Sequence, residues 1–142
     1  MAVTPNFTVS YETGLLITDA TPEQQPSLTW GMQLDGDRCI GKKDDVAAIV
    51  QSIFCTLSTE QGKYIIYPAS YGLKMEDLYG EPAAYIYAIL QERIKTALMQ
   101  DDRILNIDNF SYQASGEMLT IRYDVHVGYT EDEIIPGVFY VR

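Results

Sequence analysis

The sequence predicts an α+β domain in which two main helices pack on one face of a small antiparallel β-sheet. Two segments place apolar residues at the spacing of an amphipathic helix, and a later stretch alternates apolar and polar residues on both sides of a turn. The elements follow in the order strands, helix, short extended piece, helix, hairpin and tail, which is typical of this class. With 142 residues the chain is expected to form one domain. We divide it into an N-terminal β extension (residues 1–40), a core (residues 41–129) and a C-terminal tail (residues 130–142).

The N-terminal extension carries two strand signals. Residues 6–17 first alternate apolar and polar side chains and then form a short apolar run, which indicates one or two strands. A polar loop with two prolines follows at residues 21–27. Residues 28–34 place apolar side chains at every second position, as a strand does, and Asp35 and Gly36 predict a turn after it.

Two helices are predicted in the core. The first follows Asp44 and Asp45, which can cap free backbone amides and favour the positive helix end, and its apolar side carries Val46, Ile49, Val50, Ile53, Phe54 and Leu57. The second starts with Glu81 as the cap and Pro82 in the first turn, and its apolar side carries Ile86, Ile89, Leu90, Ile94, Ala97 and Leu98. Between them, residues 63–68 predict a short extended piece and residues 70–80 a single helical turn.

The C-terminal third predicts an antiparallel hairpin followed by a strand-like tail. Residues 103–113 and 118–129 alternate apolar and polar side chains across a turn at residues 114–117, and the apolar face of the second strand carries Leu119, Ile121, Tyr123, Val125 and Val127. After an acidic run, the tail has more apolar surface than an idle terminus needs, in Ile134, Ile135, Val138, Phe139, Tyr140 and Val141. We expect the tail to bind a surface within the fold or outside it.

Composition narrows the classes of partner and cofactor. Ten basic and twenty acidic residues give a net charge of -10, which repels nucleic acid and anionic membranes. No apolar run approaches the roughly 20 residues that span a bilayer, and no signal-peptide pattern opens the chain, so we expect it to be made and kept in a cytoplasm. Cys39, in a turn-like segment, and Cys55, in a helical pattern, are expected to be packing thiols. With His126 as the one histidine, we expect neither a metal nor another cofactor.

An enzymatic alternative would depend on carboxylates. A cell-wall hydrolase needs two carboxyl groups, one of them in an apolar cleft, and the candidates are Glu60, Glu76, Glu81 and Glu92. Each has a plainer interpretation, in a polar loop, a solvated turn, a helix start or the polar side of a helix. His126 lies on the polar face of the predicted hairpin, where a solvated strand residue is commoner than a catalyst. The sequence therefore favours a protein without catalysis.

Tyrosines gather in the middle third of the chain. Tyrosine suits positions where an apolar ring is buried and a polar tip stays wet, which describes both interfaces and the margins of a core. The sequence leaves both interpretations open for this group, which comprises Tyr64, Tyr67, Tyr71, Tyr79, Tyr85 and Tyr87.

Several separated motifs resemble one protein family. They are the first helix from "DDVAAIVQSIF", the tyrosine-rich "YIIYPASYG", the helix end with the charged corner in "ERIKTALMQDDRILNIDNF", and the hairpin. In this order they resemble the sheath initiators of contractile phage tails, the baseplate wedge proteins also described as lysozyme-like. The likeness covers about residues 41–129 and is greatest to the branch of Gram-positive prophages and phage-tail-like bacteriocins, with the baseplate subunit of type VI secretion as a relative.

The resemblance implies a structural baseplate protein without cofactors, present in six copies around the tail axis. Its partners would be the tail sheath protein, baseplate wedge proteins and tube or hub proteins, in a virion or phage-tail-like particle assembled in the bacterial cytoplasm. It would nucleate the sheath by β-strand augmentation. The sheath-facing residues would be those of the second hairpin strand and the tail, Leu119, Ile121, Tyr123, Val125, Val127, Ile134, Ile135, Val138, Phe139 and Tyr140. Tyr64, Tyr67, Tyr71 and Tyr79 would face the wedge.

The charged corner between the second helix and the hairpin is the remaining candidate site. The family carries Glu-Pro-Arg there, and the matching positions are Asp101, Asp102 and Arg103. The guanidinium fork of Arg103 can bind a carboxylate or the carbonyls of a helix end, whereas an acid at this end is poorly placed for the helix dipole. We therefore interpret the triplet as a structural corner, with Arg103 anchoring it to another element or another subunit.

Overall fold

The computed structural model describes residues 8–9, 16–17, 27–33, 36, 38–128 and 133–142. Most of the strand signal in residues 6–17 and of the loop at residues 21–27 lies outside them, as does Asp35 of the expected turn. Within them the elements are β1 (Thr8–Val9), β2 (Leu16–Ile17), β3 (Thr29–Met32), β4 (Cys39–Lys43), α1 (Asp45–Ser58), a 3₁₀ turn η1 (Glu76–Leu78), α2 (Ala83–Leu98), β5 (Ile104–Ser115), β6 (Met118–Val127) and β7 (Glu133–Val141). The predicted α+β class is confirmed.

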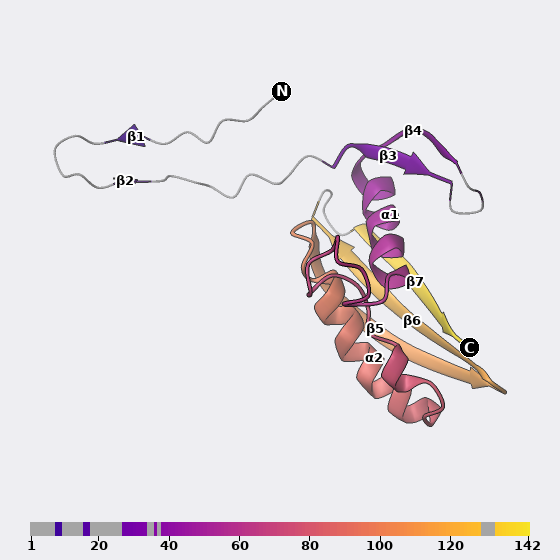
Figure 1. Cartoon of the computed structure of the whole chain (residues 1–142). Helices are drawn as coiled ribbons and strands as arrows, with labels where there is room; N and C mark the ends of the chain where they lie inside the picture. The colour runs from indigo at the N-terminus through magenta and orange to yellow at the C-terminus, as the bar shows by residue number, and fades with distance from the viewer. Residues whose placement is uncertain (1–7, 10–15, 18–26, 34–35, 37, 129–132) are drawn as a thin grey trace.

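The main sheet is antiparallel and has the order β5-β6-β7. The predicted hairpin forms from β5 and β6, which meet at a turn where Gly116 takes a positive φ of 62°. The tail adds to the other side of β6 as β7, with Leu119 opposite Val141 and Val127 opposite Glu133. Figure 1 shows α1 and α2 lying over one face of this sheet.

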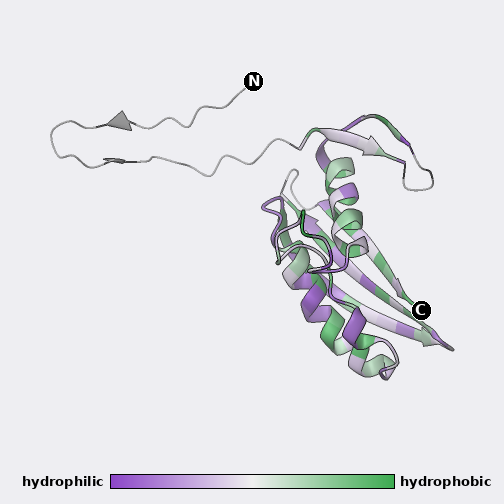
Figure 2. Cartoon of the chain, in the orientation of Figure 1, coloured by the Kyte–Doolittle hydropathy of each residue, from purple (hydrophilic) through white to green (hydrophobic). Residues whose placement is uncertain are grey.

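The core lies between the two helices and the inner face of the sheet. Along β6 every second side chain is buried, because side chains of a strand alternate between its two faces. Figure 2 shows the same alternation of apolar and polar residues on the ribbon. The fully buried large side chains are Ile49, Leu73, Leu78, Leu90, Ile94, Ile107, Ile121, Val125 and Val127.

A second small sheet, β3–β4, joins the domain through α1. Gln51 is buried and uses its side-chain amide like a neighbouring strand: Oε1 accepts from the Met32 N–H at 2.8 Å, and Nε2 donates to the Trp30 carbonyl at 2.8 Å. Asp44 caps α1 by accepting from the Asp45 N–H at 2.8 Å. Because β4 crosses residue 40, the boundary expected there falls inside a hairpin.

Local predictions were wrong at three places. Cys39 lies exposed in β4, so it is neither in a turn nor a packing residue, whereas Cys55 is half-buried with its Sγ 3.8 Å from the Met32 sulfur. Residues 63–68 form consecutive turns instead of an extended piece. The residue at the cap position of α2 is Pro82, not Glu81.

Gly137 on β7 lies directly opposite Tyr123 on β6. A Cβ at Gly137 would be 2.2 Å from Cε2 of the Tyr123 ring, so the ring occupies the space that any other residue would need. Burial of Tyr123 raises its pKa to about 12. The close contact between Gly137 and the Tyr123 ring fixes the register of β7 against β6.

Candidate functional site

The two edges of the main sheet differ in regularity. The edge strand β5 has irregular register at two places, and at the second of them Asn109 takes a positive φ of 54°. The edge strand β7 keeps unbroken pairing with β6 from Glu133 to Val141. Bulges discourage the pairing of a further strand, whereas a regular edge offers a row of unpaired backbone groups. The free edge of β7 is therefore the better template for an added strand.

An apolar groove runs beside β7 on its inner face. Its cavity of about 340 Å³ lies between α1 and the strands β6 and β7, and it is lined by Val50, Ile53, Phe54, Leu57, Ser58, Tyr123, Val125 and residues 135–140. Val50 and Phe54 belong to the apolar side predicted for the first helix, yet they are 37% and 43% exposed. Val50 and Phe54 stay exposed because the sheet has no further strand beyond β7 to cover this part of α1.

The outer face of β7 is apolar as well. Ile134, Val138 and Tyr140 point to solvent, while Ile135 and Phe139 pack against the core. The neighbouring outward residues on β6 are polar, with Arg122 opposite Val138. A strand with apolar residues on both faces is typical of one that is covered on both sides.

The structure corrects the placement of the predicted sheath-facing residues on the second hairpin strand. Their side chains are buried against the helices, and β6 has a neighbour on each side, so it has no free edge. This holds for Leu119, Ile121, Tyr123, Val125 and Val127. Among the residues named for the tail, Ile134, Val138 and Tyr140 are exposed, and Ile135 and Phe139 line the groove.

At the charged corner the guanidinium of Arg103 binds Asp101 of the same chain. Arg103 Nε donates to Asp101 Oδ1 at 2.7 Å and Nη2 donates to Oδ2 at 2.5 Å, and the two side chains are only 15% and 17% exposed. The Asp101 carboxylate also accepts from the Arg103 N–H at 3.1 Å and from the Ser52 hydroxyl of α1 at 3.2 Å. The Arg103 carbonyl accepts from the Gly128 N–H at 3.0 Å, which ties the corner to the residue after β6. Asp102 is exposed.

These contacts change the titration of Asp101. Burial raises the pKa of the carboxyl group, but the hydrogen bonds and charge of Arg103, with the bond from Ser52, outweigh it and leave the pKa below its ordinary value. The corner is thus a brace that joins α1, the end of α2 and the start of β5. The carboxylate bound by the Arg103 fork is thus that of Asp101, two residues away in the same chain.

The tyrosines of the middle third differ in their surroundings. Tyr87 is half-buried and donates its hydroxyl proton to the Phe110 carbonyl at 3.1 Å, as expected at a core margin. Tyr67 stacks on Tyr71 with ring centroids 4.6 Å apart, and Tyr64 meets Tyr67 edge-on. Tyr79 is exposed on the segment after η1. Of the predicted wedge-facing group, three rings therefore form one surface cluster.

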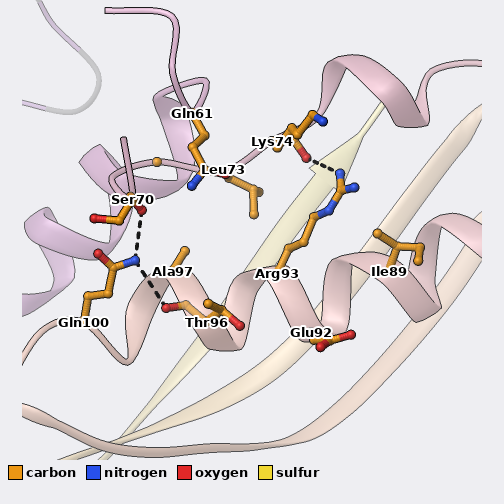
Figure 3. A pocket seen from close by; sticks show the side chains of 11 residues that line it. Gln61, Ser70, Leu73, Lys74, Ile89, Glu92, Arg93, Thr96, Ala97 and Gln100 are labelled. Atoms are coloured by element: carbon orange, nitrogen blue, oxygen red, sulfur yellow. Dashed lines mark hydrogen bonds between the residues drawn. The ribbon is translucent and has the colours of Figure 1, made fainter. Parts of the chain in front are cut away.

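A polar pocket lies between α2 and the segment before η1 (Figure 3). Its cavity is about 340 Å³. Arg93 donates to the Lys74 carbonyl and to both oxygens of Asp77, each at 2.7 Å, and the pKa of Asp77 falls to about 2, chiefly through this pairing. Gln100 donates to the Ser70 carbonyl at 2.9 Å. The polar groups on this wall thus hold the fold together.

Of the carboxylates named for the enzymatic alternative, Glu60 has a structural role. Glu60 Oε1 accepts from the Met75 N–H at 2.9 Å and the Glu76 N–H at 3.3 Å, so it caps the start of η1. His126 lies on the outer face of the sheet with Nε2 3.0 Å from Asp108 Oδ1. Within the described residues, no group of three or more His, Cys, Asp or Glu side chains is placed to hold a metal ion.

Sequence reasoning missed two residues that shape these surfaces. Gln51 is a polar residue buried on the apolar side of α1. Its position near the apolar Ala48 and Ile49 was the sequence signal that could have predicted this burial. Gly137 has no side chain to reveal its role, and only the pairing of β7 with β6 shows that it must admit Tyr123.

An α+β subunit with a regular open sheet edge, an apolar groove beside it and an exposed aromatic cluster belongs to the class of proteins that assemble with other proteins. A family model of contractile injection system sheath initiators matches residues 31–130. The chain therefore belongs to the contractile injection system sheath initiator family. A search of curated proteins found no match. No helix in the described part of the chain is both long and apolar enough to cross a membrane.

The family is a structural one, so it implies contacts with sheath and baseplate components of a phage-tail-like particle. Its match starts before residue 41 and takes in the second half of β3 and all of β4. The family model therefore matches the hairpin that Gln51 holds, apart from the first two residues of β3.

Proposed function

We propose that this chain is a non-catalytic baseplate subunit that nucleates the sheath by accepting a sheath strand on the free edge of β7. Six copies would stand around the tail axis, each bound to the wedge and to tube or hub proteins, after assembly in the bacterial cytoplasm. The observation that carries the proposal is the contrast between the regular, doubly apolar edge strand β7 and the irregular edge strand β5. Membership of the sheath initiator family supplies the sheath as the partner.

Pro136 indicates which backbone groups of β7 face the open edge. A proline in a strand is accommodated with its nitrogen, which has no hydrogen, directed away from the neighbouring strand. Backbone groups two residues apart point to the same side, so those of Ile134, Val138 and Tyr140 also face the edge. The edge therefore offers amide donors on both sides of a gap at Pro136, which would help to set the register of the added strand.

The groove supports the same arrangement. A strand added beyond β7 would lie under the uncovered part of α1, and its inward side chains would contact Val50 and Phe54. Backbone pairing and apolar burial would then act together, because one face of the added strand enters the groove. In the free subunit the acidic charge opposes edge-to-edge association.

Proline substitution at the edge tests the proposal. Val138→Pro removes one edge-facing donor while leaving the pairing of β7 with β6 intact, and Val138→Ala removes the same side chain but keeps the donor. In a producing strain whose own copy is replaced, the proline variant should enter baseplates but leave them with bare tubes, and the alanine variant should support sheath.

A folding measurement and a second proline variant keep this test decisive. Melting curves establish that Val138→Pro folds, and Ile134→Pro provides a second variant near the start of β7, where proline is better tolerated. Full-length sheath on baseplates that contain either folded proline variant would refute strand addition at this edge.

A further inference from the structure

The loop between α1 and η1 presents two isoleucines to solvent. Ile65 is 104% exposed and Ile66 is 84% exposed, more than any other large apolar side chain among the described residues. Tyr64 and Tyr67 flank them and are also exposed. Neighbouring apolar side chains that project together from a loop are typical of a protein interaction site rather than of scattered surface residues.

Ile65 and Ile66 form the tip of this loop. Successive hydrogen-bonded turns hold the loop in its shape. The Tyr67 N–H donates to the Tyr64 carbonyl at 3.2 Å, and the Tyr71 N–H donates to the Pro68 carbonyl at 3.0 Å. The side chain of Gln61 donates to the Ala69 carbonyl at 3.0 Å. The loop is thus shaped before any partner binds, which lowers the entropy cost of binding.

Aromatic stacking and a contact beyond the loop complete this support. Tyr67 and Tyr71 stack, and Tyr64 packs edge-on against Tyr67. Gln100, just beyond α2, donates to the Ser70 carbonyl at 2.9 Å. The tyrosines therefore brace the tip, and the isoleucines are the side chains left free to enter a partner.

The charge of the loop indicates the chemistry of that partner. Lys63 is the one formally charged residue in residues 61–73, within a chain of net charge -10. Its Nζ lies 5.9 Å from the centroid of the Tyr64 ring, beside the tip. An apolar pocket with an acidic rim would complement both the isoleucines and this ammonium group.

The position of the loop separates it from the sheath-facing edge. In Figure 1 the middle of the segment between α1 and η1 lies on the side of α1 away from β7, whereas its two ends, at Thr59–Glu60 and Leu73–Met75, border a pocket beside the end of β7. A strand added to β7 would therefore not cover the tip. The same subunit can hold one partner at each surface.

We infer that Ile65 and Ile66 form a plug that inserts into an apolar, acid-rimmed pocket of a baseplate protein other than the sheath. The inference rests on the proposed function only in assigning the partner to the same particle. The inference assigns baseplate attachment to this loop, whereas the proposed function assigns sheath attachment to β7. Loss of the loop contact should therefore give baseplates that lack this subunit, and loss of the β7 contact should give baseplates that contain it but carry no sheath.

The first test replaces both isoleucines. Ile65→Asp with Ile66→Asp should melt like the wild-type protein, because neither side chain packs in the fold, but the protein should be missing from purified baseplates. Each isoleucine lost from a buried contact should weaken binding roughly ten- to hundredfold. Ile40→Asp is the matched control on β4, where Ile40 is 60% exposed, and should enter baseplates normally.

This outcome differs from failure at the sheet edge, where the subunit stays in the baseplate without sheath. Normal incorporation of the doubly substituted protein would overturn the plug, whether or not the Val138→Pro result supports the edge.

The second test identifies the partner by a photo-crosslinking residue placed at position 65 in assembled particles. A crosslink to a baseplate protein that is neither sheath nor a second copy of this chain is the expected result. Crosslinks to sheath or to a second copy, or none at positions 65 and 66, would overturn the inference. So would binding of the wild-type protein, but not the double variant, to vesicles of phosphatidylcholine and phosphatidylglycerol, which would make the tip a lipid contact.

Discussion

Replacing Arg103 by alanine should destabilise the subunit itself. Removing one member of a buried ion pair costs roughly 3–5 kcal/mol, because the remaining charge is left without its partner. The Asp101–Arg103 pair is partly exposed, and Asp101 keeps its bonds from Ser52 and from the backbone N–H of residue 103. We therefore expect a loss of about 2 kcal/mol in the free energy of unfolding. For a domain of this size the melting temperature should fall by roughly 6 to 8 °C.

The assay is thermal unfolding of the purified subunit beside a matched control. Arg93→Ala also breaks a bidentate pair, with Asp77, but that pair lies at the surface and its loss should shift the melting temperature less. In an Asp101→Asn background the Arg103→Ala substitution should lower the free energy of unfolding by clearly less than it does alone, because the carboxylate that pairs with Arg103 is then absent.

The pH dependence provides an independent check with a defined sign. The folded-state pKa of Asp101 is lowered below 3.8, so its stabilising contribution is present above about pH 4 and is lost as the pH falls through the folded pKa. The difference in stability between the wild-type protein and Arg103→Ala should therefore shrink below about pH 4. An unchanged melting temperature with lost assembly would refute the brace and make Arg103 an anchor for another subunit.

Two further substitutions test the joints of the fold. Gly137→Ala should destabilise the protein by roughly 1–3 kcal/mol in chemical unfolding, because the new Cβ would overlap the Tyr123 ring, and a stability equal to wild type would show that β7 can shift to admit it. Gln51→Ala should leave the Met32 N–H and the Trp30 carbonyl without their partner and speed hydrogen exchange in β3 while β6 stays protected; equal protection of β3 in both proteins would mean that other contacts hold the hairpin.

The sequence predicted those parts of the fold whose residues repeat with a clear period. The 3.6-residue spacing located α1 and α2, and the alternation in residues 118–127 located β6 and its buried face. Periodicity does not specify which strand pairs with which. The tail could therefore be expected to bind a surface, but its pairing with β6 required the three-dimensional structure.

The candidate site was predictable only in outline for the same reason. A helical pattern tells which side of α1 is apolar, but not how far the sheet extends beneath it, so the exposure of Val50 and Phe54 could not be foreseen. The fork of Arg103 could reach several acceptors, and Asp101, two residues away, competes successfully because the turn brings its carboxylate into contact. Ile65 and Ile66 looked like part of a strand, since β-branched residues favour strands, yet hydrogen-bonded turns override that preference.

The unequal edges of the main sheet also limit how copies of this chain could associate with one another. If two copies met through their β7 edges, the combined sheet would end on both sides at a β5 strand with its irregular register and its left-handed Asn109. Continued stacking into a fibre requires a regular edge at each end of every growing sheet. Pairing errors through this sheet would therefore stop at a dimer, so the subunit can keep one edge open for a partner without becoming the start of an aggregate.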